Sequence, residues 1–163
     1  MTEVIVRPGR RMGESDSLSA DRERAAVRRG LRPLLEPNER IDYAFRATAG
    51  PRGAVWLGPS ANHGGAALVA PVLLAAARAL KVMNVIVVVT DRAIVLVRAS
   101  QFAERPVEVI ARLPRQTQIG PFAGRGWITL HGTRMWVRDV PDLLDVQAAD
   151  QEMGYDTGPP AIW

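Results

Sequence analysis

The sequence predicts a mainly β (α+β) protein, in which a small antiparallel sheet carries one helix inserted early and one helix at its end. The clearest observation is residues 85–97, VIVVVTDRAIVLV, where two apolar β-branched runs flank Thr90-Asp91-Arg92, a pattern typical of a β-hairpin. A second observation is the alternation of apolar and polar side chains from Ile41 onward, which indicates a half-buried strand. A third is the apolar stripe in residues 141–153, which predicts a closing helix that ends before Gly154.

The composition indicates a globular domain without disulfide bonds. The chain has 163 residues, of which 47% are hydrophobic and 23% charged, enough for one domain with a buried core. It has no cysteine, so disulfides, thiolate metal sites and cysteine nucleophiles are excluded. The first residues lack the hydrophobic region of a signal peptide, so a cytoplasmic location is expected. We expect residues 1–30 to form a tail with a short helix, 31–154 the domain, and 155–163 a second tail.

The elements follow in order from local signals. A short helix is expected to start after Ser19 and end at Gly30, with Arg28 and Arg29 suited to the negative end of its dipole. Its apolar face is thin, so it is expected to dock weakly or to link to a partner. About seven or eight strands are expected, at residues 41–48, 54–57, 85–89, 93–97, 106–113, 116–120, 127–131 and 135–137.

The central hairpin has a further implication, because its strands do not alternate. Val85–Val89 and Ala93–Val97 are apolar at every position, whereas a strand with one wet face alternates, so both faces are expected to be covered. One face belongs to the core, and the apolar segment 66–80 is expected to cover the other. At the turn, Asp91 is expected to bond its own backbone, and Arg92 is either a solvated side chain or a ligand contact.

The segment Ala66–Leu80 predicts an inserted apolar helix whose regular part begins near Pro71. Its uncharged run, Gly64–Ala77, is 14 residues long, shorter than the roughly 20 that a membrane-spanning helix needs. Three interpretations stay open: packing on the outer face of the central strands, contact with a membrane surface, or a subunit or partner interface. The residues expected to contact a partner or a membrane are Leu68, Val72, Leu73, Arg78, Lys81 and Arg92.

Four short motifs occur along the chain in a fixed order. They are LEPNER at residues 35–40, VVVTDRAIVLV at 87–97, Arg105-Pro106, and WITL at 127–130. Their order resembles the bacterial pleckstrin-homology-like domains, in particular small actinobacterial members, over residues 31–154. The resemblance implies a bent antiparallel barrel of about seven strands, with one open end plugged by the C-terminal helix. It also implies a binding or scaffolding role without catalytic residues.

The sequence departs from the wider superfamily in two respects. Members that bind phosphoinositides place a cluster of Lys and Arg across the first two strands, whereas residues 43–57 offer only Arg46 and Arg52. Head-group recognition of that kind is therefore not expected. The insertion at 58–81 is also longer than the basic fold needs.

Side chains for catalysis, a cofactor or a metal are not recognised in the sequence. His63 and His131 lie in a loop and beside a turn glycine, without spaced ligands. The net charge is +4, but Trp127 and Trp136 are expected in the core, which favours a protein partner over nucleic acid. We expect a non-catalytic module for protein–protein interaction or homo-oligomerisation. The alternative is a peripheral membrane module that contacts anionic lipid through residues 66–83 and nearby arginines.

Overall fold

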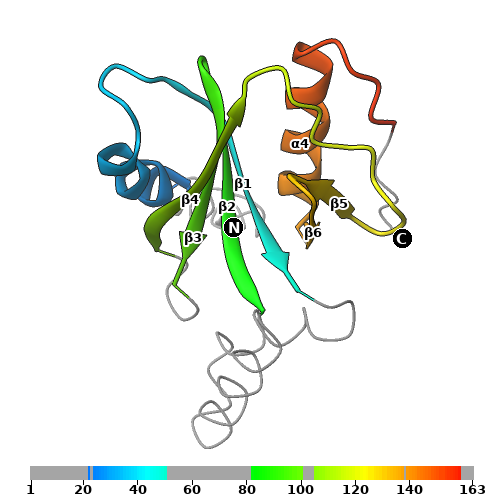
Figure 1. Cartoon of the computed structure of the whole chain (residues 1–163), viewed down its shortest axis with the longest axis horizontal. Helices are drawn as coiled ribbons and strands as arrows, with labels where there is room; N and C mark the ends of the chain where they lie inside the picture. Colours follow the sequence, from blue (N-terminus) through cyan, green and yellow to red (C-terminus); the bar gives the residue numbers. More distant parts are fainter. Residues whose placement is uncertain (1–21, 23, 51–81, 101–104, 138, 159–163) are drawn as a thin grey trace, which may run out of the picture.

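The protein folds around one curled antiparallel sheet (Figure 1). The computed structural model describes residues 22, 24–50, 82–100, 105–137 and 139–158. Six strands lie in this part of the chain, and the sheet has the order β4-β3-β2-β1-β6-β5. The strands are β1 (Ile41–Ala49), β2 (Met83–Thr90), β3 (Ala93–Ala99), β4 (Pro106–Pro114), β5 (Trp127–Leu130) and β6 (Thr133–Trp136). The helical elements are residues 24–31, the 3-10 helix η1 (Arg32–Leu34) and the closing helix α4 (Val140–Glu152). The mainly β prediction is confirmed as a half-barrel sheet with helices.

Strands β2 and β3 form the predicted hairpin and lie in the middle of the sheet. Val87 pairs with Leu96, and Val89 pairs with Ile94. The face toward α4, the inner face, buries Val85, Val87, Val89, Ile94 and Leu96, and the opposite, outer face buries Ile86, Val88, Val95, Val97 and Ala99. The prediction that both faces of the hairpin are covered is therefore confirmed.

The outer face is covered by helix 24–31 and η1. Leu31 is fully buried against the outer-face residues, and Val27 and Leu34 pack beside it. These three residues follow the i, i+4, i+7 spacing of one helical face. The predicted end at Gly30 was wrong by one residue, because Leu31 is still helical and η1 follows it directly. Leu31 and Leu34 therefore extend the apolar face that Val27 begins. The segment 66–80, predicted to cover this face, lies outside the described residues.

The inner face is closed by α4. Leu143, Val146 and Ala149 recur at helical spacing on one side of α4 and are buried in the same core as Phe45 of β1. The predicted helix at 141–153 is thus confirmed within one residue at each end. Helix α4 and helix 24–31 therefore lie on opposite faces of the sheet (Figure 1).

The segment 116–120 is not a strand, contrary to the prediction. Its backbone bonds a side chain instead of a neighbouring strand: the N–H groups of Ile119 and Gly120 donate to the carboxylate of Asp150 at 2.8 and 2.7 Å. The hydroxyl of Thr157 also donates to Asp150. Thr157 is buried, so the packed unit extends beyond the boundary at 154 that the sequence predicted. The expected strand at 54–57 lies outside the described residues.

The two tryptophans of the last hairpin are not core residues, also contrary to the prediction. Trp127 and Trp136 pair directly across β5 and β6 and are only half-buried, whereas Ile128 and Met135 point into the core. The guanidinium carbon of Arg134 lies over the ring of Trp127, 5.0 Å from its centre. Alternation along a strand shows that one face is buried but not which one. Here the buried face carries the aliphatic residues Ile128 and Met135.

Candidate functional site

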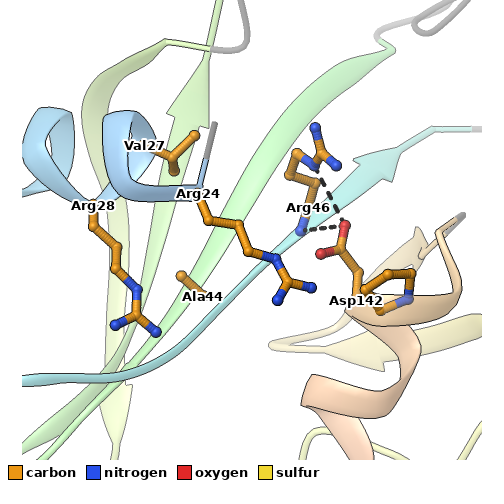
Figure 2. Close-up of a pocket in the computed structure, with 7 residues that line it drawn as sticks. Arg24, Val27, Arg28, Ala44, Arg46 and Asp142 are labelled. Atoms are coloured by element: carbon orange, nitrogen blue, oxygen red, sulfur yellow. Dashed lines mark hydrogen bonds and ion pairs between the residues drawn. The ribbon is translucent and has the colours of Figure 1, made fainter. Parts of the chain in front are cut away.

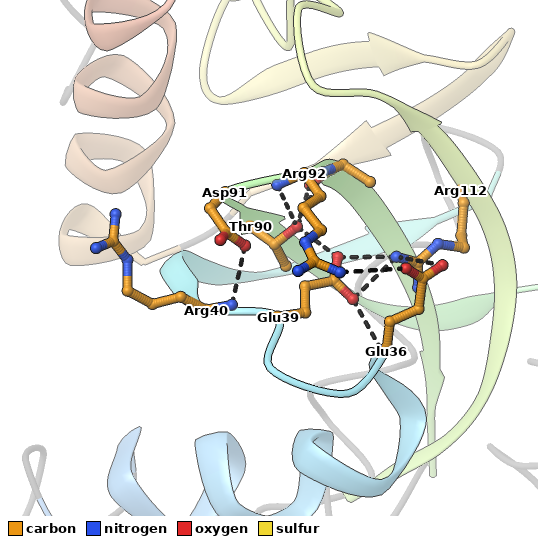
Figure 3. Close-up of polar contacts among 8 residues, drawn as sticks. Glu36, Glu39, Arg40, Thr90, Asp91, Arg92 and Arg112 are labelled. Carbon is orange, nitrogen blue, oxygen red and sulfur yellow. Dashed lines mark hydrogen bonds and ion pairs between the residues drawn. The ribbon is translucent and has the colours of Figure 1, made fainter.

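A buried carboxylate joins the 35–40 loop to the β2–β3 turn and to β4 (Figure 3). The side chain of Glu39 is completely buried, with 0% of its surface exposed. Both of its carboxylate oxygens accept from Nη2 of Arg112, at 2.8 and 2.9 Å. Oε1 also accepts the Thr90 hydroxyl at 2.6 Å, and Oε2 accepts the main-chain N–H of Glu36 at 2.9 Å. Two of the motifs that carry the family resemblance are thus in direct contact.

Thr90, and not Asp91, bonds the backbone of the β2–β3 turn. Thr90 Oγ1 accepts the N–H groups of Arg92 and Ala93 at 3.2 and 2.9 Å, so Thr90 closes the turn. The Asp91 carboxylate accepts the main-chain N–H of Arg40 at 2.9 Å, and the Arg40 carbonyl accepts the N–H of Asp91 at 3.1 Å. The prediction that Asp91 bonds its own turn is therefore wrong. Arg40 lies just before β1, and its N–H donates to the Asp91 carboxylate instead of to a neighbouring strand.

Glu39 stays ionised in this network. Burial alone raises the pKa of its carboxyl, but the hydrogen bonds from Arg112, Thr90 and the Glu36 N–H outweigh burial, and the pKa lies below its ordinary value. A lowered pKa means that Glu39 stabilises the fold above its unfolded-state pKa. That contribution is lost as the pH falls through the folded-state pKa.

A pocket lies between helix 24–31, β1 and the start of α4 (Figure 2), and we call it the arginine pocket. Its volume is about 90 Å³. It has three apolar, three basic and one acidic lining residues: Val27, Ala44, Pro141, Arg24, Arg28, Arg46 and Asp142. Two of the lining residues, Arg46 and Asp142, are bonded to each other. The Arg46 main-chain N–H donates to Asp142 Oδ2 at 3.2 Å, and the Arg46 Nε forms an ion pair with the same oxygen at 3.4 Å.

Asp142 is the titratable group of the arginine pocket. Burial raises the pKa of its carboxyl to about 6, against the opposing effect of the Arg46 charge and hydrogen bonds. Only 7% of the Asp142 side chain is exposed. Since the pKa is raised in the folded state, protonation of Asp142 favours folding. Its stabilising contribution is complete below the ordinary value of 3.8 and is lost as the pH rises through about 6.

Asp142→Asn is expected to remove this pH dependence. As the pH falls from about 8 to about 5, the raised pKa should give the wild-type chain about 1.5 kcal/mol of stability that the variant does not gain. Asparagine keeps an oxygen that can accept the Arg46 N–H. Urea unfolding of both chains across this pH range measures the difference, and Asp156→Asn, at an exposed acid, is the control. A difference between wild type and Asp142→Asn that does not change with pH would contradict the assignment.

A second concavity, the basic groove, lies on the other flank of helix 24–31. Its volume is about 510 Å³. It is lined by four arginines together with Ala25, Asn38, Glu39 and Ile41; the arginines are Arg28, Arg29, Arg32 and Arg40. Arg28 lines both the basic groove and the arginine pocket, so helix 24–31 presents positive charge on both flanks.

Strand β4 forms one edge of the sheet in the described part of the chain. Four consecutive residues, Val107–Ile110, are exposed. Val107 and Ile110 are 48% and 43% exposed, and neither has a partner in the register between β3 and β4, which is irregular at both positions. These β-bulges turn two apolar side chains out of the sheet.

Of the contact residues predicted from the sequence, the structure places only Arg92. Its side chain is 52% exposed at the β2–β3 turn, with Nη1 at 3.8 Å from Oε2 of Glu36. The other five, Leu68, Val72, Leu73, Arg78 and Lys81, lie outside the described residues.

Sequence reasoning missed both the arginine surface of helix 24–31 and the edge position of β4. The run RERAAVRRGLRP at 22–33 held a signal for the first, since five arginines accompany the apolar stripe. The edge position depends on strand order, which local sequence does not specify.

The described residues contain no cluster of three or more histidine and acidic side chains that could hold a metal ion. Among the helices that the structure describes, none has the length and apolar character needed to cross a membrane. The chain matches no protein-family model, and comparisons with curated proteins and with solved structures give no match.

Proposed function

We propose that the protein is a non-catalytic binding module that recruits a partner protein by pairing an extended segment of the partner with β4. The observation that carries the proposal is the exposed run Val107–Ile110 on an edge strand. An edge strand presents main-chain N–H and C=O groups to an added strand, and pockets or anchors for alternate side chains give specificity.

The side chains of β4 support this proposal. Charged side chains are one means by which proteins blunt an exposed edge, yet the run Val107–Ile110 holds three large apolar residues and one acid, Glu108. Glu108 is itself paired with Arg98 at 3.0 Å, so it does not repel an incoming strand as a lone charge would. The bulged residues Val107 and Ile110 are the two anchors that an added segment would cover.

We also propose that the half-barrel is pleckstrin-homology-like. The order of the four sequence motifs supports this, as does the contact between LEPNER and the Thr90-Asp91-Arg92 turn. The closing position of α4 on the inner face agrees with the helix that plugs the barrel in that fold. A seventh strand, expected at 54–57, would complete the resemblance.

The interaction surface is tested by replacing both anchors, Val107→Lys together with Ile110→Lys. Val140→Lys with Leu144→Lys is the matched control, because these α4 residues are 43% and 48% exposed and equally apolar. A displayed library of random nine-residue peptides, as long as β4, is selected on the full chain. Selected peptides should bind the β4 variant at least about tenfold more weakly than wild type and bind the control unchanged.

Backbone amide shifts of the full chain report where a selected peptide binds. The proposal expects the largest shifts in β4 and β3. Selected peptides that bind both variants alike, or that shift amides only outside β4 and β3, would refute recruitment at this edge. Thermal unfolding of each variant excludes global unfolding as the cause of a lost signal.

A further inference from the structure

The basic groove concentrates positive charge that the described part of the chain neutralises only in part. Arg29 and Arg32 form no ion pair among the described residues. Arg40 is paired with Asp42 through Nε at 3.0 Å, but its side chain is still 76% exposed. We propose that the basic groove is a binding site for phosphate-bearing anions. None of the residues that line the groove belongs to β4, so this site is separate from the exposed run Val107–Ile110.

The one acid that lines the groove does not oppose an anion strongly. Glu39 accepts both of its short ionic contacts from Arg112 and is shielded from solvent. Glu36 lies 3.4 Å from Arg112 and 3.8 Å from Arg92. These two acids and two arginines form a charge-balanced cluster that borders the groove at Glu39. The arginines of helix 24–31 and η1 lie outside this cluster, and its acids do not neutralise their charge.

Helix stability does not explain all four arginines. Arg28 and Arg29 near the end of helix 24–31 favour the negative end of its dipole. Arg32 directly follows the helix in η1 and can also favour that dipole, but Arg40 directly precedes β1 and cannot. Two separate segments of chain thus bring guanidinium groups to one concavity.

Arg40 is also held in place. Its main chain is fixed to the β2–β3 turn by the pair of hydrogen bonds with Asp91, at 2.9 and 3.1 Å. The groove wall that carries Arg40 is therefore anchored to the central hairpin. A preorganised wall lowers the ordering cost that a flexible charged loop would pay on binding.

The chemistry of the groove favours phosphate groups. A guanidinium presents a planar fork of N–H donors that matches two oxygens of a phosphate, and it keeps its charge at all physiological pH values. Several such forks around a groove of about 510 Å³ suit an anion with more than one negative charge. A diphosphate meets this requirement as a free anion, and phosphate head groups meet it on an anionic lipid surface.

The test measures the binding of inorganic pyrophosphate to the full chain by isothermal titration calorimetry at low ionic strength. The groove variant is Arg29→Gln with Arg32→Gln. The control is Arg125→Gln with Arg134→Gln, which removes the same charge from exposed arginines near β5 and β6, the opposite edge of the sheet. We expect single-site binding that weakens at least about tenfold in the groove variant, stays within about twofold in the control and weakens with added salt.

Sedimentation with vesicles distinguishes the two sources of phosphate. Vesicles of phosphatidylcholine alone are compared with vesicles that also contain phosphatidylglycerol. Binding of pyrophosphate without binding of vesicles supports the proposed site and identifies its ligand as a free anion. Binding of anionic vesicles that is lost in the groove variant supports the site and identifies its ligand as a lipid surface. Binding of neither probe overturns the proposal, as does binding that the groove and control variants reduce equally. Circular dichroism shows whether each variant is folded.

Discussion

Asp150→Ala is expected to lower the free energy of unfolding by about 4 kcal/mol. Asp150 is completely buried, and its carboxylate accepts the N–H groups of Ile119 and Gly120 and the hydroxyl of Thr157. Alanine would leave the Ile119 and Gly120 donors without their acceptor, and hydrogen bonds to a charged group contribute more than neutral ones. Urea unfolding followed by far-UV circular dichroism measures the loss.

The neighbouring substitution Gln151→Ala is the control, since Gln151 is exposed on the same turn of α4. It should change stability by less than about 0.5 kcal/mol. Limited proteolysis adds a local readout: in Asp150→Ala, the 115–126 connection should be cut before the strands. A variant as stable as wild type, with that connection still protected, would show that Asp150 does not hold the segment.

Arg112→Met is expected to destabilise the protein by about 3 kcal/mol, because it leaves the buried Glu39 carboxylate without its ionic partner. The loss should shrink as the pH falls. In wild type the lowered pKa of Glu39 adds stability above the unfolded-state pKa, and that stability disappears at acid pH. Chemical unfolding at neutral and at acid pH measures both effects.

A double-mutant cycle with Glu39→Gln isolates the pair. If the ion pair carries the effect, Glu39→Gln with Arg112→Met should cost less than the sum of the single changes. Arg92→Met is the comparison for an exposed pair, because its contact with Glu36 is long and solvent-accessible, and it should cost less than about 1 kcal/mol. Strictly additive single changes would contradict a direct interaction between Glu39 and Arg112.

The parts of the fold that could be predicted have strong local signals. The hairpin at 85–97 combines two β-branched runs with a polar turn, and α4 combines a start at Pro141 with a stop at Gly154. Both signals depend on residues close together in the chain. The burial of both faces of the hairpin could also be predicted, because it depends only on the absence of apolar–polar alternation in the two strands.

The remaining features depend on contacts between residues far apart. Asp91 and Arg40 are separated by 51 residues, so turn chemistry alone could not indicate that the carboxylate bonds the Arg40 N–H. The segment 116–120 has strand-like residues, but Asp150, 30 or 31 residues later, takes its N–H groups. The apolar face predicted for helix 24–31 was thin because Gly30 indicates a stop, which places Leu31 outside the helix.

The candidate sites were less predictable than the fold for the same reason. The basic groove combines arginines of helix 24–31 and η1 with Arg40, and their convergence depends on the 35–40 loop folding back on the sheet. The exposure of Val107 and Ile110 depends on β4 lying at an edge and on its two bulges. The sequence shows the residues, but their surroundings arise only from tertiary packing.

The position of helix 24–31 before β1 has a consequence for how the chain is synthesised. The chain leaves the ribosome N-terminus first, so residues 24–31 emerge before β2 and β3. Their outer face, with Ile86, Val88, Val95 and Val97, is a β-branched surface that could stack against another nascent chain. Residues 24–31 have left the ribosome by then and can form their helix against that surface as it appears, because a helix this short is stabilised by packing. Its burial of Leu31 thus offers protection from aggregation at the stage when the sheet is incomplete.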